Sequence, residues 1–544
     1  MEKMDVLITN AEVVTLDDND SVAGSVAVKD GEIAWISTEK YPVDAPESGE
    51  VVDLEGRTLI PGFIDTHNHL LMYSQYLGQI NCRSPLNENI GDIQKLIEAE
   101  AKQKEKGEWI IGWGYDDTLL EESRHPTRED LDAVAPDHPV LIRHISAHFA
   151  AVNSLALELA GVYETIEDPP GGHFGRDEQG ALDGVLHEFS AMDFVDSIIP
   201  EYTEEDLAQL MEKGAREYVS KGITTSTDAG VGLVRGMEEY KAHVKVLKEN
   251  RIPLRMRYMV LHHLLREGAP FAGYTREELQ QQISEDTDDR ATLDSAKMFQ
   301  DGSIQGLTGA LRHPYHCDSS ITGNLIQEQK DFNEEVLDLH SRGFRMATHG
   351  NGDRAIGSII DAYTYALEKN PEKDRRHRIE HVQTGSAEDL DRMKDWGIEA
   401  SFFINHVYYW GDRHRDIFLG NERAARLNPL KDAAEKGFRF TLHSDCPITP
   451  ISPLFSIWAA VNRITSGGEV LGEGQKIDAL TALKSMTSYG AWLNFEEGIT
   501  GTIEAGKRAD FAVLDTNPLR CDPMAIKDIS VEATYIGGEK VYGT

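Results

Sequence analysis

Cysteine is scarce in this sequence, and so is any long apolar run. Widely separated thiols are typical of reduced cysteines in a cytosol, and they exclude a cysteine-based zinc knuckle. No run approaches the ~18 apolar residues that span a bilayer, and the start of the chain lacks the apolar stretch of a signal peptide. We therefore expect a cytoplasmic protein. The four cysteines among the 544 residues are Cys82, Cys317, Cys446 and Cys521.

Basic residues are few relative to acidic ones. Lysine and arginine together number 54, against 93 aspartates and glutamates, which leaves a formal net charge of −39. A surface this acidic repels nucleic-acid phosphates and anionic lipid headgroups, so we expect no nucleic-acid and no membrane partner. We interpret the excess charge as a solvated acidic face. The size and the globular composition favour an enzyme that acts on a small-molecule substrate.

Both ends of the chain are rich in short strand-like runs of valine and isoleucine. The dipeptide Asp30-Gly31 stands between two of these runs, and such a pair is typical of a tight hairpin turn. We expect the two end segments, 1–60 and 491–544, to pair into one small composite β-sandwich domain. The runs cover residues 5–14, 25–29 and 32–37 near the start, and 509–514, 533–536 and 539–542 near the end.

The middle of the chain alternates helix and strand. Four times, an amphipathic helical stretch ends in a glycine that leads directly into a short apolar strand, at 221–228, 342–349, 396–403 and 436–443. Such alternation builds a parallel sheet, and eight units favour an α/β fold of the (β/α)8 barrel type over 61–490, with a long insertion at about 70–205. The eight expected strands start near residues 58, 222, 254, 295, 344, 378, 398 and 438.

Polar residues with metal-binding chemistry recur at the carboxyl ends of these strands, where a barrel of this type carries its active site. Imidazole nitrogens together with a carboxylate suit zinc or a similar divalent ion, and the lack of cysteine is typical of an open, catalytic site. The candidate metal ligands are His67 and His69 after the first strand, Lys297 at the fourth, His349 at the fifth, His381 at the sixth and Asp445 after the eighth.

Each of these residues has an ordinary alternative interpretation. A single histidine at a strand end is commonly a hydrogen-bonded structural residue. The alternative role for Asp445, which precedes Pro447, is the N-cap of a helix. The alternative for Lys297 is a solvated lysine on a strand. The convergence of six such residues at one end of the predicted barrel favours the metal site.

The segments around these residues carry specific motifs. PGFIDTHNH at 61–69 and GTIEAGKRAD at 501–510 resemble the opening and closing motifs of the amidohydrolase superfamily. Within it, the chain resembles the YtcJ-like branch over nearly its whole length. The motifs that carry this resemblance are GWGYD (112–116), NSLAL (153–157), PPGG (169–172), GITTSTDAG (222–230), KMFQDGS (297–303), HGNGDR (349–354) and RIEH (378–381).

The resemblance implies a metal-dependent hydrolase of carbon–nitrogen bonds that acts on an N-substituted formamide or another small acyl-amine. All six candidate ligands match the family's metal-site motifs. The family's lysine is commonly carboxylated and bridges two ions, so Lys297 is expected to carry a carboxylate group. The expected metal is zinc, and spacing leaves one ion or two open. Asp445 is expected to move the proton during catalysis. His148 is a candidate for stabilising the oxyanion or binding the substrate, with a structural role as the alternative.

Other residues are candidates for supporting roles. The candidate substrate contacts are Trp113, Asp116, Asn405 and His406. For Trp113 a core aromatic residue is an equal alternative. His377, Asp353 and His443 flank the candidate ligands and are expected to orient them.

Two departures from the branch leave the substrate open. GLTG at 306–309 replaces a segment that often contains an arginine, and His187 stands where arginine is frequent. A deaminase or cyclic amidase of the same superfamily stays an alternative, as does a non-catalytic regulator that retains the fold. A homodimer is the default expectation for the oligomeric state.

Overall fold

The computed structural model describes residues 3–84, 86–145, 149–233 and 235–543. The chain divides into two compact units, one formed by Met1–Leu71 with Met211–Thr544 and the other by Met72–Leu210. The insertion expected at about 70–205 falls on the second unit. No helix among the described residues is long and apolar enough to cross a membrane.

Eight parallel strands form the central sheet of the first unit. Its two outermost strands meet, because the Thr66 hydroxyl donates a hydrogen bond of 2.9 Å to the Thr441 hydroxyl. The sheet is therefore a TIM-like barrel, as the sequence predicts. In sheet order its strands are β8 (Phe63–Asn68), β15 (Ile223–Val231), β16 (Arg255–Leu261), β17 (Ala291–Phe299), β18 (Met346–Gly350), β19 (Arg378–His381), β20 (Glu399–Phe402) and β21 (Thr441–Leu442).

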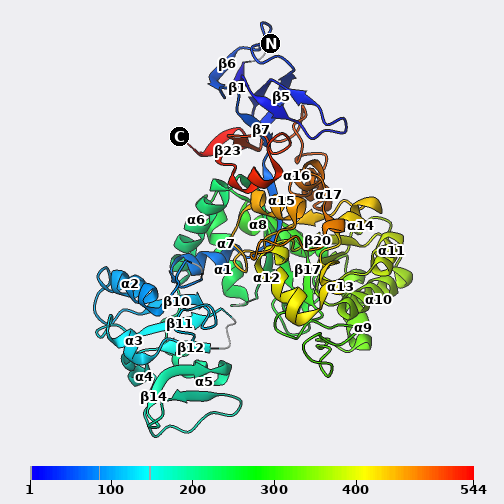
Figure 1. Ribbon diagram of the computed structural model, residues 1–544. Coiled ribbons are helices and arrows are strands. Elements are labelled where there is room, and N and C mark those ends of the chain that lie inside the picture. Colours follow the sequence, from blue (N-terminus) through cyan, green and yellow to red (C-terminus); the bar gives the residue numbers. More distant parts are fainter. Residues whose placement is uncertain (1–2, 85, 146–148, 234, 544) are drawn as a thin grey trace. The chain divides into compact units, whose positions relative to one another are not determined.

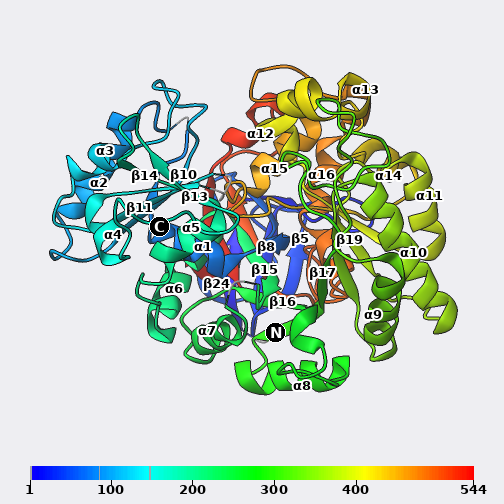
Figure 2. The same ribbon diagram turned by 90° about the horizontal axis from the view of Figure 1, so that it is seen from below.

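Helices lie around the outside of the barrel strands (Figure 2). In α10, Ile356, Ile359 and Tyr363 are buried at helical spacing, while Asp361 on the opposite face is exposed. The glycines predicted to turn helices into strands, at 222, 343, 397 and 437, all have positive φ. The outer helices are α6 (Glu204–Ser220), α7 (Met237–Lys248), α8 (Arg276–Thr287), α9 (Gln329–Ser341), α10 (Asp353–Lys369), α11 (Ala387–Trp396) and α14 (Leu430–Glu435).

The sequence predicts the first barrel strand over 58–65, and this prediction is wrong as a single element. The structure has two strands there, β7 (Thr58–Pro61) and β8, which belong to different sheets and are separated by Gly62. A Cβ at Gly62 would lie 2.3 Å from side-chain atoms of Thr224, so only glycine fits at this crossing. The similar run at 5–14 is also two strands, β1 (Met4–Thr9) and β2 (Glu12–Val14).

Strands from both ends of the chain share one sheet (Figure 1). β7 pairs with β2 on one side and with β22 (Phe511–Leu514) on the other. The remaining members of this six-stranded sheet are β3 (Val22–Ala23), β23 (Val531–Ile536) and β24 (Glu539–Tyr542), and a four-stranded sheet contains β1, β4 (Ser25–Lys29), β5 (Glu32–Ser37) and β6 (Ser48–Asp53). Residues of both sheets, among them Val26 and Phe511, form one apolar cluster.

The second unit is built on a six-stranded sheet of its own. Two short apolar runs of the sequence, 109–112 and 140–144, predict strands in this unit, and the structure has β10 (Ile110–Tyr115) and β11 (Val140–His144) there. In order, the sheet contains β13 (His173–Arg176), β14 (Leu182–His187), β12 (Phe149–Val152), β11 (Val140–His144), β10 (Ile110–Tyr115) and β9 (Ile80–Asn81). The helices are α2 (Ile90–Ala101), α3 (Arg128–Asp132), α4 (Ser154–Leu159) and α5 (Glu188–Asp196), and α1 (Leu70–Leu77) precedes β9.

Candidate metal centre

Three of the predicted ligands offer donor atoms that all lie within 4.8 Å of one another: His67, His381 and Asp445. The Nε2 atoms of His67 and His69 are each 3.3 Å from Oδ1 of Asp445. An ion with ligands at about 2.1 Å places neighbouring donors about 3.0–3.4 Å apart, in tetrahedral or octahedral geometry. The spacing of these donors therefore fits a single ion held between β8 and the turn after β21.

His349 and Lys297 lie beside this group, on neighbouring strands. Nδ1 of His349 is 2.9 Å from Nε2 of His381, and β17 pairs with β18 so that Lys297 stands opposite Ala347. Lys297 is 1% exposed, so the interpretation as a solvated lysine is wrong. Burial lowers the pKa of Lys297 to about 8. Among the described residues its ammonium has no ion-pair partner, and Nζ lies 5.0 Å from the ring centroid of Phe299.

His67 is held by a carboxylate that sequence reasoning missed. Its Nδ1 bonds to Oε2 of Glu380, and the other oxygen of Glu380 lies 2.6 Å from Nε of Arg378. Burial raises the pKa of Glu380, but the charges of Arg378 and His67 outweigh this and hold it far below its usual value. An ionised Glu380 therefore fixes the His67 ring with Nε2 toward Asp445. The signal lay in the motif RIEH, whose glutamate precedes His381 directly.

Two of the converging residues have unusual backbone conformations. His381 has φ of 72° and Asp445 has φ of 52°, in the left-handed region that side chains other than glycine rarely adopt. Such strain persists where the surroundings impose it and gathers at functional sites. The interpretation of Asp445 as a helix cap is wrong, because the next helix, α15 (Pro453–Asn462), has Ser452 as its N-cap.

The protonation states of these groups suit metal binding. Burial raises the pKa of Asp445, but the charge of His67 and hydrogen bonds from His67 and His69 outweigh it and keep the pKa well below its usual value. Burial lowers the pKa of His349 to about 4 and that of His381 well below its usual range. At neutral pH the carboxylate is ionised and these two imidazoles are neutral, which are the forms that bind divalent cations.

His443 lies beside the predicted ligands and offers further nitrogen atoms to an ion. Within the described ranges neither ring nitrogen of His443 has a hydrogen-bond partner, and the same holds for Nδ1 of His381. Both side chains are buried, and the ring of His443 stacks on that of His67 with centroids 4.5 Å apart. Buried polar atoms normally have a partner, so these orphaned nitrogens fit a site that is completed by an ion.

One protein-family model matches most of the chain. The family model described as "Amidohydrolase family" matches residues 50–542 of the chain. The chain belongs to the amidohydrolase family.

Individual relatives confirm the resemblance to the YtcJ-like branch. The amidohydrolase is 29% identical to N-substituted formamide deformylase of Arthrobacter pascens, over 98% of this chain and 97% of that one. It is 28% identical to the putative amidohydrolase YtcJ of Bacillus subtilis, over 95% and 96% of the two chains. Among solved structures, an uncharacterized metal-dependent hydrolase from Pyrococcus furiosus shares the fold, with a TM-score of 0.72, 23% identity and coverage of 95% and 100%.

Two of the candidate substrate contacts, Asn405 and His406, follow β20, and each contacts other residues of the barrel unit. The Asn405 side chain donates to Thr449 Oγ1 at 2.9 Å and accepts from the Ser456 hydroxyl at 3.1 Å, so both ends of its amide are engaged within the barrel unit. His406 begins α12 (His406–Arg413) and is buried, with its ring centroid 4.0 Å from that of Phe403. Their substrate contacts stay predictions.

Two of the three expected orienting residues bind elsewhere in the amidohydrolase. His377 accepts from the Met346 backbone N–H at 3.0 Å, and its Nε2 lies 3.1 Å from Nδ1 of His340. Asp353 accepts from the Arg312 backbone N–H at 2.7 Å. Neither bond reaches a predicted ligand, so the orienting role expected for them is wrong; Glu380 fills it for His67.

The remaining predicted residues of the amidohydrolase belong to the second unit. Trp113 stacks on Tyr76 with centroids 4.1 Å apart, and the guanidinium of Arg83 lies 3.8 Å from its ring centroid. Asp116 accepts hydrogen bonds from the N–H and hydroxyl of Thr118. Their substrate contacts stay predictions. His148 lies outside the described residues.

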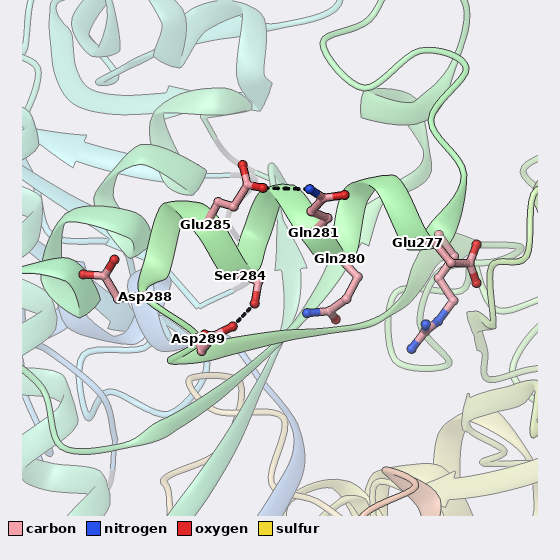
Figure 3. A pocket seen from close by; sticks show the side chains of 8 residues that line it. Glu277, Gln280, Gln281, Ser284, Glu285, Asp288 and Asp289 are labelled. Carbon is pink, nitrogen blue, oxygen red and sulfur yellow. Dashed lines mark hydrogen bonds between the residues drawn. The ribbon is translucent and has the colours of Figure 1, made fainter.

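A pocket of about 470 Å³ runs along α8 of the amidohydrolase (Figure 3). Its polar side chains pair among themselves, since Gln281 donates to Glu285 and Ser284 to Asp289. Because α8 leads into the start of β17, this pocket lies at the amino end of that strand, whereas Lys297 is near its carboxyl end. The pocket is therefore separate from the candidate metal centre.

Proposed function

We propose that this protein is a metal-dependent hydrolase that cleaves the carbon–nitrogen bond of a small acyl-amine, with N-substituted formamides as the substrate class. The observation that carries the proposal is the convergence of His67, His381 and Asp445 at the carboxyl end of the barrel. The similarity to a formamide deformylase over nearly the whole chain supports the choice of substrate class.

The metal would be zinc, as one ion or two. His67, His69, His381 and Asp445 would hold it, with His349 and Lys297 completing the site. When bound, a divalent ion supplies Lewis acidity, which acidifies water and polarises a carbonyl group. We infer that Lys297 carries a carboxylate group. Its buried position, without an ion-pair partner in the part of the chain that the structure describes, supports this. An ammonium next to cations is repelled, whereas a carbamate offers two ligand oxygens.

Asp445 is the proton carrier in this proposal. Its carboxylate takes a proton from the attacking water, and it then delivers the proton to the nitrogen of the leaving amine, so that a formamide yields formate and a free amine. Glu380 keeps the His67 ring in position throughout, because its bond to Nδ1 leaves Nε2 free to bind an ion. His148 would stabilise the oxyanion.

The two terminal sheets form a composite β-sandwich in this proposal, made of 1–60 and 491–544 and attached to a barrel of 61–490. The apolar cluster that includes Val26 of one sheet and Phe511 of the other supports it, as does the pairing of β7 with β22.

A product assay tests the proposed function. Zinc-loaded protein is incubated with N-alkyl and N-aryl formamides, longer acyl-amines, cyclic ureas and aminopurines, and formate, free amine and ammonia are measured separately. Formate and amine in equal amounts support the proposal. Ammonia from aminopurines would establish a deaminase, ring opening of cyclic ureas a cyclic amidase, and no turnover of any class a non-catalytic protein.

A further inference from the structure

A second group of histidines and aspartates lies at one edge of the six-stranded sheet in the second unit. Strand pairing places Tyr115 opposite His144, Phe149 opposite His187, and His187 opposite His173. The rings of His144 and His187 both pack against Phe149, with centroids 5.4 and 5.3 Å from it. The edge therefore gathers imidazoles from strands that are far apart in the sequence.

Two carboxylates face His144 directly. Oδ1 of Asp117 is 3.0 Å from Nε2 of His144, and Oδ1 of Asp116 is 3.9 Å from the same nitrogen. One donor atom from each of the three residues lies within 4.8 Å of the other two. The side chains of His144, Asp116 and Asp117 are 9%, 12% and 25% exposed, so the group is largely shielded from water.

These separations are close to those around a bound ion. Ligands at about 2.1 Å put neighbouring donors about 3.0–3.4 Å apart. The distance to Asp117 already has this value, and the one to Asp116 needs a carboxylate shift of roughly half an ångström. Thr118 donates to Asp116 from both its backbone N–H and its hydroxyl, at 3.0 and 2.6 Å, and such support is usual for ligating carboxylates.

We propose that Asp116, Asp117 and His144 bind one divalent transition-metal ion, with Zn²⁺ and Mn²⁺ as the class of cation. Two carboxylates and an imidazole form a mixed oxygen and nitrogen donor set that suits these ions. The ion fixes the turn after β10 to the end of β11. Asp116 then serves as a ligand instead of the substrate contact predicted from the sequence. The proposal is independent of the proposed hydrolase function, because no residue of the barrel takes part.

Metal stoichiometry tests this site. The full chain carrying His67→Ala and His69→Ala, which removes two donors of the barrel centre, is stripped with a chelator, reloaded with Zn²⁺ or with Mn²⁺, and desalted. Bound metal per chain is measured by elemental analysis. Adding Asp117→Asn and His144→Gln to this background is expected to lower the metal content by one ion per chain and to remove the metal-induced rise in melting temperature.

His173→Ala in the same background is the matched control. His173 stands at the same sheet edge and stacks on His187 at 3.9 Å, yet no ion pair joins it to either aspartate among the described contacts. This variant should keep the full metal content. Equal metal content with and without Asp117→Asn and His144→Gln overturns the proposal. If that pair of changes prevents folding, Asp117→Asn alone, which preserves the side-chain shape, must lower affinity at least 10-fold in a chelator competition, and unchanged affinity overturns the proposal equally.

Discussion

Glu380 shows how a single residue organises the candidate centre. It binds His67 with one carboxylate oxygen and pairs with Arg378 through the other, and it is fully buried. Histidine ligands are usually held in this way by a carboxylate, which fixes the ring and strengthens its donor nitrogen. Metal affinity in the barrel should therefore depend on a residue that is itself outside the set of predicted ligands.

The variant Glu380→Gln tests this dependence. We expect zinc affinity of the barrel centre to fall roughly 10- to 100-fold, the usual cost of losing such a partner, as measured by chelator competition. Asp294→Asn is the control, because Asp294 also faces Arg378, at 3.9 Å, without bonding to His67. It should lower the free energy of unfolding and leave zinc affinity unchanged. Equal loss of affinity in both variants would show that Glu380 acts through Arg378 and the fold alone.

Asp445 should be essential for turnover. Asp445→Asn keeps the shape and loses the basic oxygen, so we expect kcat for a formamide to fall by ~100-fold or more. Product formation and melting temperature are measured on the same preparation. A rate within a few-fold of wild type would remove Asp445 from proton transfer.

Lys297 should respond to carbon dioxide. Because a carbamate forms on a neutral buried amine, reconstitution of metal-free protein with zinc should give more active enzyme with bicarbonate than in CO2-depleted buffer. Protein treated with ¹³C-bicarbonate should show a carbamate resonance that Lys297→Ala lacks. Lys297→Ala should be nearly inactive, with partial rescue by a short carboxylic acid. A fully active enzyme with an unmodified amine would contradict the bridging role.

Some features of the candidate metal centre could be predicted from the sequence and others could not. The positions of His67, His69 and Asp445 at one end of the barrel were predictable, because each stands at or just after the end of a strand with a clear apolar pattern. Glu380 was missed although the motif RIEH places it directly before His381, since its role depends on a contact with His67, which lies 313 positions away. The orienting roles expected of His377 and Asp353 failed because proximity in sequence does not give direction in space.

At the scale of elements, the crossing at Gly62 carries the chain from the terminal sheet into the barrel. The predicted runs 5–14 and 58–65 are strand-like in composition over their whole length. Composition alone therefore did not reveal that each run is divided into two strands. The breaks lie at Gly62, where a side chain does not fit, and next to Asn10, which has φ of 53°. Packing sets backbone constraints of this type, so a local sequence pattern indicates them only weakly.

Gly62→Ala tests the crossing. The added methyl group would meet Thr224 at 2.3 Å, and overpacking of this kind costs about 1–3 kcal/mol of stability. We expect a lower midpoint in urea unfolding and partial recovery when Thr224→Ala is added. Full stability of the single variant would show that the two strands separate easily.

At the scale of the whole molecule, the barrel was predictable and the second unit largely was not. Eight predicted strands, four of them entered from a helix through a glycine, gave a strong, repeated signal. The sheet of the second unit includes strands as short as Ile80–Asn81, whose pairing joins segments that are distant in the chain. The group of Asp116, Asp117 and His144 in this unit was not predicted either, because its members come together only through such strand pairing.

We propose that hydrolysis depends on a metal held in the barrel by His67, His69, His381 and Asp445. The most direct measurement is formate release from an N-substituted formamide by metal-free and zinc-reloaded protein, with His67→Ala/His69→Ala measured in parallel. We expect no formate from the metal-free protein, recovery on reloading with zinc, and no recovery in the double variant despite a native melting profile. Full formate release by metal-free protein, or by the zinc-treated double variant, would contradict this proposal.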